Sequence, residues 1–444
     1  MNQSPWPPYP KYKDSGVEWL GKVPEHWEVK KIRNISTSLD HKRIPLNAEQ
    51  RAEKQGNIPY WGANSIVDYI NELIFDETLV LLGEDGAPFF EKDKPVAFLS
   101  IGPIWPNNHI HVLRINSTAD PGFVKYSLNS VDYSNFVDGS TRDKLTQSKM
   151  NNIQLSFPPL SEQLAIVSFL DQETSRIDAL ISEKERLISL LQEYRQTLIS
   201  HTVIKGLDPN VKMKDSGVEW LGEVPEHWEM KRLRFVAKFN PSKTEATLLD
   251  RSTEVSFLPM EAIGNDGSLD LERTRPIGEL DTKYTYFREG DVTIAKITPC
   301  FENGKGAIMR GLFNGIGFGT TELIVARPKS EKTTSQYLYQ IFISSPFRKF
   351  GEAAMYGAGG QKRVSDDFIQ DFSTAFPPLS EQLSISSFLD RETSRIDTLI
   401  SEAKKFIDLL KEYRSSLITA AVTGKIDVRE VVPPGSEKRE IAYE

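Results

Sequence analysis

Cysteine is almost missing from this sequence: Cys300 is the single one among 444 residues. One thiol cannot form an internal disulfide, and it cannot supply the ligands of a cysteine-based zinc site. We interpret Cys300, in the strand-like run AKITPCF, as a small packing residue rather than a nucleophile. The composition therefore excludes an internal disulfide framework.

Long hydrophobic runs are also missing. No run approaches the roughly 18 apolar residues that a membrane-spanning helix needs. The first residues, MNQSPWPPYPKYKDSG, do not have the pattern of an export signal. We therefore expect a soluble cytoplasmic protein, and 444 residues predict two to four domains.

An excess of positive charge is the third feature that the sequence lacks. A net charge of −8 and a pI near 5.5 argue at first against a nucleic-acid-binding protein, because phosphate neutralisation dominates such binding. Residues 30–156, however, carry 14 basic and 15 acidic side chains, and residues 232–375 carry 19 and 18. A basic face on either segment is compatible with this balance.

Catalytic patterns are incomplete. The runs WPPY at 6–9 and NIPY at 57–60 approach the Asn/Asp-Pro-Pro-Tyr loop of adenine methyltransferases, but neither has the full motif or a glycine-rich cofactor turn. No G-x-x-x-x-G-K-[ST] loop occurs. His109 and His111 would share one face of a strand, but no second cluster completes a metal site, so we interpret them as a polar strand end that contacts solvent or nucleic acid. We assign no catalytic residue and no metal site.

Two internal repeats dominate what is present. The run KDSGVEWLGKVPEHWEVKKIR, from Lys13, returns as KDSGVEWLGEVPEHWEMKRLR from Lys214. A second block, which opens with FPPLSEQ at Phe157, returns 219 residues later at Phe376. The order is therefore N-terminal block, variable segment and helical block, written twice.

Each helical block predicts one long amphipathic helix. Two prolines followed by Ser161 and Glu162 suit a helix start, and apolar residues then recur at alternating spacings of three and four. The predicted seam consists of Ile166, Leu170, Ile177, Leu180, Leu187 and Leu191 in the first block and of Ile385, Leu389, Ile396, Leu399, Phe406 and Leu410 in the second.

Such a seam needs a partner, and each copy shares its register and length with the other. We predict an antiparallel pair, which would hold the two variable segments at opposite ends with pseudo-twofold symmetry. A parallel pair, or separate packing of each helix onto its own domain, is the alternative.

The variable segments predict mixed structure. Strand-like runs such as ETLVLLG, HIHVLRI, EVSFLPM and DVTIAKI are separated by glycine, proline or asparagine and accompanied by helical runs. The predicted fold class is α+β, with two mixed α/β domains separated by two long helices that form an antiparallel coiled coil. The predicted boundaries are 1–156 for the first domain, 157–205 for the first helical spacer, 206–375 for the second domain, 376–428 for the second spacer and 429–444 for a polar C-terminal tail.

Polar loops precede both helical blocks. Their glycines let the backbone approach a ligand, and their cationic and amide side chains suit phosphates or base edges, although ordinary solvated turns share this composition. The DNA-binding candidates are Arg142, Lys144, Gln147, Gln361, Lys362 and Arg363 from these loops, Tyr60, Trp61 and Asn64 from IPYWGANS, Asn108, and Lys296, Asn303 and Lys305 from AKITPCFENGKGA.

The doubled KDSGVEWLG-x-VPEHWE, the doubled PPLSEQ with ETSRID and LL-x-EYR, and the loops DGSTRDKLTQS and GAGGQKRV resemble the specificity (S) subunit of type I restriction-modification enzymes over nearly the whole chain. The resemblance implies two target-recognition domains, each of which binds one half of an asymmetric, bipartite double-stranded DNA site. It also implies docking of two modification (M) subunits, which carry S-adenosylmethionine and the adenine-N6 methyltransferase activity. Restriction (R) subunits would join them with ATP and magnesium, and this chain would hold no cofactor.

Two other functions stay open. A single-chain enzyme would bind S-adenosylmethionine by itself, and a scaffold with a coiled-coil spine would show no affinity for DNA.

Overall fold

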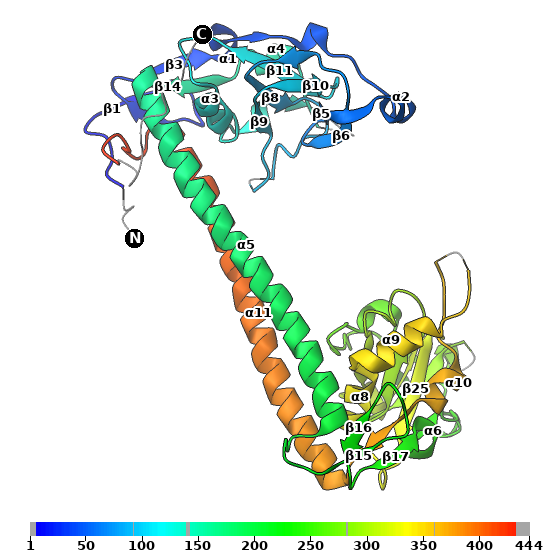
Figure 1. Ribbon diagram of the computed structural model, residues 1–444. Coiled ribbons are helices and arrows are strands. Elements are labelled where there is room, and N and C mark those ends of the chain that lie inside the picture. Colours follow the sequence, from blue (N-terminus) through cyan, green and yellow to red (C-terminus); the bar gives the residue numbers. More distant parts are fainter. Residues whose placement is uncertain (1–5, 92, 139–142, 281–282, 359, 432–444) are drawn as a thin grey trace. The chain divides into compact units, whose positions relative to one another are not determined.

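The computed structural model describes residues 6–91, 93–138, 143–280, 283–358 and 360–431. The chain divides into two compact units: unit 1 comprises Met1–Glu185 and Ala403–Glu444, and unit 2 comprises Arg186–Glu402. Each unit contains a globular α+β part and a portion of each of the two long helices (Figure 1). Among the described residues, no helix combines the length and the apolar character needed to cross a bilayer.

The two long helices are α5 (Leu160–Lys205) and α11 (Leu379–Val422). Each begins directly after a proline pair, which cannot continue a helix backwards. Gly206 and Gly424, with φ of +78° and +70°, follow the two C-terminal ends. Glycine adopts this left-handed conformation without the steric cost of a Cβ, so it suits a helix end.

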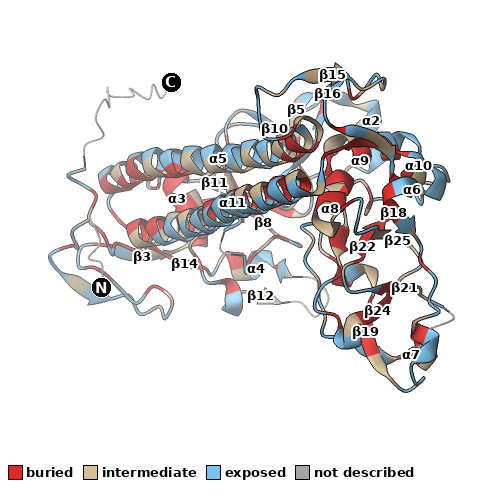
Figure 2. Cartoon of the chain, turned by 90° about the horizontal axis from the view of Figure 1, so that it is seen from below, coloured by how far each residue is buried: buried red, intermediate tan, exposed pale blue. Residues whose placement is uncertain are grey.

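The helices lie side by side and antiparallel in each unit (Figures 1 and 2). In unit 1, Arg414 of α11 pairs with Asp178 of α5, and the Lys184 amine lies over the Phe406 ring at 5.9 Å. Residue numbers therefore increase along α5 as they decrease along α11, so the two helices are antiparallel. In unit 2, Arg195 Nε lies 3.0 Å from Asp397 Oδ1. The predicted fold class is confirmed.

The described residues of unit 1 form two four-stranded sheets. The first has the order β4-β11-β8-β9 and the second the order β6-β5-β10-β7, in which β5 and β10 are parallel. The strands of these two sheets are β4 (Ser36–Ser38), β11 (Ile110–Ile115), β8 (Leu79–Gly83), β9 (Ala97–Ser100), β6 (Ile66–Ile70), β5 (Gln55–Trp61), β10 (Pro103–Pro106) and β7 (Phe75–Asp76). The two-stranded pairs are β1 (Tyr12–Asp14) with β2 (Lys22–Pro24), β3 (Glu28–Lys31) with β14 (Gln154–Phe157), and β12 (Val137–Asp138) with β13 (Lys144–Leu145). The helices are α1 (Ile32–Ile35), α2 (Ala48–Glu53), α3 (Pro121–Leu128) and α4 (Gln147–Met150).

Unit 2 repeats this topology although its variable segment has a dissimilar sequence. Its sheets have the orders β18-β25-β22-β23 and β20-β19-β24-β21, and β19 and β24 form the parallel pair. The strands are β18 (Ala237–Phe239), β25 (Leu323–Pro328), β22 (Val292–Ala295), β23 (Gly306–Ile308), β20 (Thr274–Pro276), β19 (Glu254–Leu258), β24 (Ile316–Gly319) and β21 (Thr285–Arg288). The pairs β15 (Met213–Asp215) with β16 (Glu223–Pro225) and β17 (Glu229–Arg232) with β26 (Ser373–Phe376) complete the unit, together with α6 (Leu233–Val236), α7 (Ile277–Leu280), α8 (Ser335–Ile343), α9 (Ser345–Ala353) and α10 (Asp366–Asp371).

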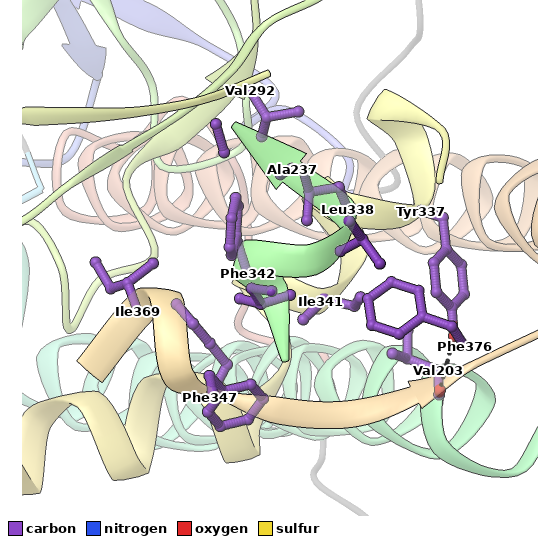
Figure 3. Packing of buried hydrophobic residues seen from close by; sticks show 14 of the residues in the cluster. Val203, Ala237, Val292, Tyr337, Leu338, Ile341, Phe342, Phe347, Ile369 and Phe376 are labelled. Atoms are coloured by element: carbon purple, nitrogen blue, oxygen red, sulfur yellow. Dashed lines mark hydrogen bonds between the residues drawn. The ribbon is translucent and has the colours of Figure 1, made fainter. Parts of the chain in front are cut away.

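The main core of unit 2 packs the sheet that contains β22 and β25 against the long helices (Figure 3). Tyr337 of α8 is fully buried, and its hydroxyl donates a hydrogen bond of 3.1 Å to the carbonyl of Val203 in α5. Ile385 and Leu389 of α11 belong to the same hydrophobic cluster. The domain and both helices therefore share one core.

The predicted apolar seam needs a correction in the middle of the helices. Most of its end residues are buried, namely Ile166, Leu170, Ile177, Ile385, Leu389 and Ile396, whereas Leu180, Leu191 and Leu410 are partly buried. Leu187, Leu399 and Phe406 are 41%, 44% and 44% exposed, whereas Ala403, which follows the same predicted register, is buried together with Ile407. A strict seven-residue pattern drifts by about 20° per heptad on a straight helix, so three heptads carry the pattern off the contact face.

Candidate nucleic-acid interface

The repeated sequence motifs meet at the base of each globular part. In unit 1, Glu162 of PPLSEQ accepts hydrogen bonds from Trp27 Nε1 at 3.1 Å and from the Tyr9 hydroxyl, and it lies 2.9 Å from His26 Nε2. In unit 2, Glu381 meets His227 at 2.8 Å and Trp228 at 3.2 Å. The motif VPEHWE is therefore a packing junction for the start of a long helix.

The glutamine of the same motif fixes the start of a helix that lies earlier in the chain, α3 in unit 1 and α8 in unit 2. In unit 1, Gln163 Oε1 accepts from the backbone N–H of Asp120, the N-cap of α3, at 2.8 Å. In unit 2, Gln382 Oε1 accepts from the Thr333 hydroxyl at 2.9 Å and from the Thr334 amide, the N-cap of α8, at 3.2 Å. Because the repeated blocks provide the same supports, two dissimilar variable segments can adopt one topology.

In unit 2, two stretches with DNA-binding candidates lie side by side. Residues 296–305 follow β22, and residues 356–364 precede α10. The Thr298 amide donates to the Lys362 carbonyl at 3.0 Å, and the Val364 amide donates to the Lys296 carbonyl at 2.9 Å. The Lys362 amide in turn donates to the Thr298 hydroxyl oxygen at 3.1 Å. Candidates that are more than 50 residues apart in sequence therefore share one surface.

Arg363 is held at the centre of this surface. Its Nε donates to Glu322 Oε2 at 3.0 Å, and its Nη2 donates to Glu322 Oε1 at 2.8 Å. The hydrogen bonds from Arg363 lower the pKa of the Glu322 carboxyl, and the charge of Lys296 acts in the same direction. The carboxylate, which precedes β25, therefore stays ionised and orients the guanidinium.

The other candidates of unit 2 lie on the same two stretches of chain and differ in burial. Gln361, Lys362 and Asn303 are exposed, whereas Lys296 and Lys305 are partly buried. The Lys305 amine donates to the Met260 carbonyl at 3.0 Å, so this side chain has a structural bond.

Unit 1 has the equivalent arrangement at the end of β8. The Leu145 amide donates to the Glu84 carbonyl at 2.8 Å, and the Gly86 amide donates to the Asp143 carbonyl at 2.9 Å. Lys144, which the 219-residue offset aligns with Arg363, has its amine 3.4 Å from Glu84 Oε1. Both units therefore place the cation of this loop beside a carboxylate, which follows β8 in unit 1 and precedes β25 in unit 2.

His111 lies beneath this loop in unit 1, and its predicted contact with solvent or nucleic acid is wrong. The residue is 0% exposed, with Nδ1 2.6 Å from Asp40 Oδ2 and Nε2 2.8 Å from the Leu145 carbonyl. Arg43 Nη1 donates to Glu84 Oε2 at 2.6 Å beside it. The groups of Asp40, Glu84 and His111 are close enough together for a metal ion, but Arg43 and Lys144 already supply positive charge to the two carboxylates. This cluster of charged residues therefore supports the loop.

Asp40 was not predicted, because it is 71 residues from His111 in sequence. Burial alone would raise the pKa of the Asp40 carboxyl, but the hydrogen bond and charge of His111, the Val112 amide and Arg43 together lower this pKa.

The other candidates of unit 1 have different environments. The prediction that Tyr60 contacts DNA is corrected by its burial, because the residue is only 2% exposed and belongs to the core. Its hydroxyl donates to the Leu46 carbonyl and accepts from the Leu46 amide. Trp61 is partly buried against Phe98. Asn64, Asn108, Lys144 and Gln147 are exposed, and Gln147 Nε2 donates to the Ser38 hydroxyl oxygen at 2.8 Å. Arg142 lies outside the described residues.

Comparison with known proteins identifies relatives of both halves. A family model described as the type I restriction modification DNA specificity domain matches residues 24–189 and again 225–406. The chain is 35% identical to the EcoEI specificity subunit and 40% identical to the EcoAI specificity subunit, both of Escherichia coli. These two matches cover 55% and 47% of this chain but only 40% and 35% of those proteins. The MjaVIII specificity subunit of Methanocaldococcus jannaschii is 24% identical, over 92% of this chain and 95% of its own length.

Solved structures share the fold. A chain from a structure of the type I R-M system aligns with a TM-score of 0.66 at 15% identity, over 91% of this chain and 99% of that chain. The HsdS subunit of Thermoanaerobacter tengcongensis aligns with a TM-score of 0.51 at 15% identity, over 93% and 100%. Two α+β units of one topology, joined through long helices, define the structural class. By its two matched domains, the chain belongs to the type I restriction-modification specificity family.

Proposed function

We propose that this chain is the non-catalytic DNA-specificity subunit of a type I restriction-modification complex, and that each unit reads one half of a bipartite, asymmetric site. The observation that carries the proposal is the identical sheet order of the two units, built from dissimilar variable segments. One scaffold with two sets of surface side chains suits two different base sequences. Identical readers related by a twofold axis would instead read a palindrome.

The surface that we propose for DNA lies at the paired loops of each unit. In unit 2 it includes the exposed Tyr356, Gln361 and Lys362, and in unit 1 the exposed Asn108 and Lys144. Amide and cationic side chains can contact both base edges and phosphates. The overall charge of −8 fits a subunit that shares its phosphate contacts with partner chains.

We propose that two copies of the modification subunit, which carry S-adenosylmethionine and the adenine-N6 methyltransferase activity, dock on the long helices. In unit 2, α5 exposes Leu187, Leu190 and Tyr194. The 219-residue offset converts them into Phe406, Leu409 and Tyr413, which α11 exposes in unit 1. Apolar side chains at spacings of three and four form one stripe on a helix, so the chain offers the same surface twice. Restriction subunits, which use ATP and magnesium, would join this assembly.

The experiment that tests the function is methylome sequencing of a host that expresses this chain with its modification subunit. We expect N6-methyladenine in one bipartite motif with two different specified halves and an unspecified spacer. Methylation of the same motif without this chain, or a continuous palindromic motif, would contradict the proposal. Binding of S-adenosylmethionine by the isolated chain would instead favour a single-chain enzyme.

Introducing a negative charge into each exposed apolar stripe tests whether the modification subunits dock there. Leu409→Asp and Leu190→Asp should each reduce the number of bound modification subunits from two to one, and the double variant should bind none, as measured by native mass spectrometry. Lys404→Asp, at an exposed position of α11 outside the stripe, is the matched control and should leave two subunits bound. Two bound subunits in the double variant would place the docking surface elsewhere.

A further inference from the structure

We infer that Arg363 reads a guanine in the half-site of unit 2, and that Glu322 is the positioning residue that holds it for this contact. The inference rests on the proposed function, and it assigns one base and two residues within the surface of unit 2.

The backbone of Arg363 is fixed on both sides. Its amide donates to the Tyr356 carbonyl at 2.9 Å, and its carbonyl accepts from the Tyr356 amide at 3.1 Å. Ile297 forms a β-bridge with Arg363 from the opposite side. The side chain is thus attached to a backbone point held by two β-bridges, and little conformational entropy is lost when it binds a ligand.

The guanidinium has one edge occupied and one edge available. Of its five N–H donors, the carboxylate of Glu322 takes one from Nε and one from Nη2. Nη1 lies 3.5 Å from the Gln361 carbonyl, at the outer limit for a hydrogen bond, and the side chain is 36% exposed. The edge formed by Nη1 and Nη2 therefore keeps two parallel N–H groups for a ligand.

Guanine is the base that matches this edge. In the major groove it presents two adjacent acceptors, O6 and N7, whereas adenine presents one acceptor and one donor, and cytosine presents a donor. A phosphate could also accept two hydrogen bonds, but the carboxylate of Glu322 would repel it. A pair of opposite charges contributes little to sequence-independent attraction to the phosphate backbone. The ion pair therefore favours a base contact over a phosphate contact.

Unit 1 provides an internal comparison. At the aligned position, Lys144 lies 3.4 Å from Glu84, and an ammonium group is a compact point charge without a planar fork. We expect the guanine contact only in the half-site of unit 2.

The test measures methylation by the full complex on DNA libraries in which each half-site is randomised. The wild-type complex should require at least one G·C pair in the half-site of unit 2. Arg363→Lys should reduce the preference for that pair roughly 10- to 100-fold and leave the other half-site unchanged. Glu322→Gln should reduce the same preference by a smaller factor, and Glu322→Asp, which keeps the charge, should retain more of it than Glu322→Gln.

Lys362→Ala is the matched control on the same loop. It should weaken binding equally for all sequences and reduce the salt slope by about 0.9, as expected for one lost phosphate contact. Thermal unfolding and assembly with the modification subunit should be unchanged in all four variants. The inference is overturned by a unit 2 half-site without a required G·C pair, or by an Arg363→Lys effect that is equal for all sequences. The proposed function itself would fail on a different result, namely the absence of a bipartite motif or methylation of the same motif without this chain.

Discussion

Arg414 of α11 donates to Asp178 of α5, with Nε 2.9 Å from Oδ1 and Nη2 3.3 Å from Oδ2. The 219-residue offset converts this pair into Arg195 and Asp397, which meet at 3.0 Å in unit 2. The aspartate of each ETSRID motif therefore pairs with the arginine of the other copy's EYR motif. Two equivalent ion pairs require the antiparallel register, because only that arrangement brings the start of one block opposite the end of the other.

A double-mutant cycle on this pair tests the register. Arg414→Asp alone should destabilise the chain by about 0.5–1 kcal/mol, because the pair is partly exposed and two carboxylates would then face each other. The double variant Arg414→Asp with Asp178→Arg should recover most of the loss in chemical unfolding. Equal instability of the single and double variants would contradict the pairing.

The glycine after α11 gives a second prediction. A Cβ at Gly424 would lie 2.4 Å from Pro24 Cδ and 3.1 Å from Trp27 Cη2, whereas a Cβ at Gly16, whose φ is nearly the same, would meet nothing within 4 Å. Gly16→Ala should cost about 1–2 kcal/mol from backbone strain alone. Gly424→Ala should cost about 1–3 kcal/mol more, because the junction must shift. Similar losses of thermal stability in the two variants would show that Gly424 does not pack against the N-terminal block.

The buried charged cluster of unit 1 predicts a dependence on pH. The pKa of Asp40 is lowered in the folded chain, so its contribution to stability is present above its unfolded pKa of about 3.9 and is lost as the pH falls through the folded value. Asp40→Asn should therefore destabilise the chain at pH 6 by about 1–3 kcal/mol, since it removes a buried charged partner of His111. The difference in the free energy of unfolding between the wild-type chain and Asp40→Asn should be smaller at pH 3. Urea unfolding at both pH values decides this, and a constant difference would show that Asp40 is not the titrating group.

The repeats made the long helices predictable, since proline pairs and spacings of three and four are local signals. The middle of the seam was not predictable from spacing alone, because the drift of a heptad pattern on a straight helix accumulates over three heptads. The order of the strands in the sheets could not be predicted from the sequence either, because a strand-like run does not specify which strand it pairs with.

In the candidate site, too, local sequence patterns did not reveal which distant residues pair. Lys296, Lys362 and Arg363 were predictable as polar loop residues, but Glu322 is 41 residues from Arg363 and no local pattern connects them. Tyr60 lies in a glycine-bounded run of amide and aromatic side chains, yet it belongs to β5, and its ring can be buried because the backbone of Leu46 satisfies its hydroxyl. Composition indicates loops that can bind, whereas burial and pairing depend on tertiary contacts.

The continuous helices predict a dependence of the DNA spacer on helix length. Removing residues 182–188 together with 401–407 shortens each helix by about 10 Å, or roughly three base pairs at 3.4 Å each. Leu180 and Leu399 would then occupy the positions of Leu187 and Phe406, so the exposed stripes stay apolar. The variant should fold, keep both half-site sequences and prefer a shorter spacer, which methylation of sites with varied spacing would measure. Removal from one helix alone should impair folding, and an active double deletion with the original spacer would show that the helices do not set it.

The most direct test of the central claim, that the two units read separate half-sites, is exchange of one variable segment. Residues 30–156 are replaced by the same segment of a related specificity subunit, and the methylome of a host that expresses the hybrid with its modification subunit is sequenced. We predict that one half of the motif changes to that of the donor while the other half is unchanged. A change in both halves, or loss of methylation by a complex that still assembles, would contradict the account.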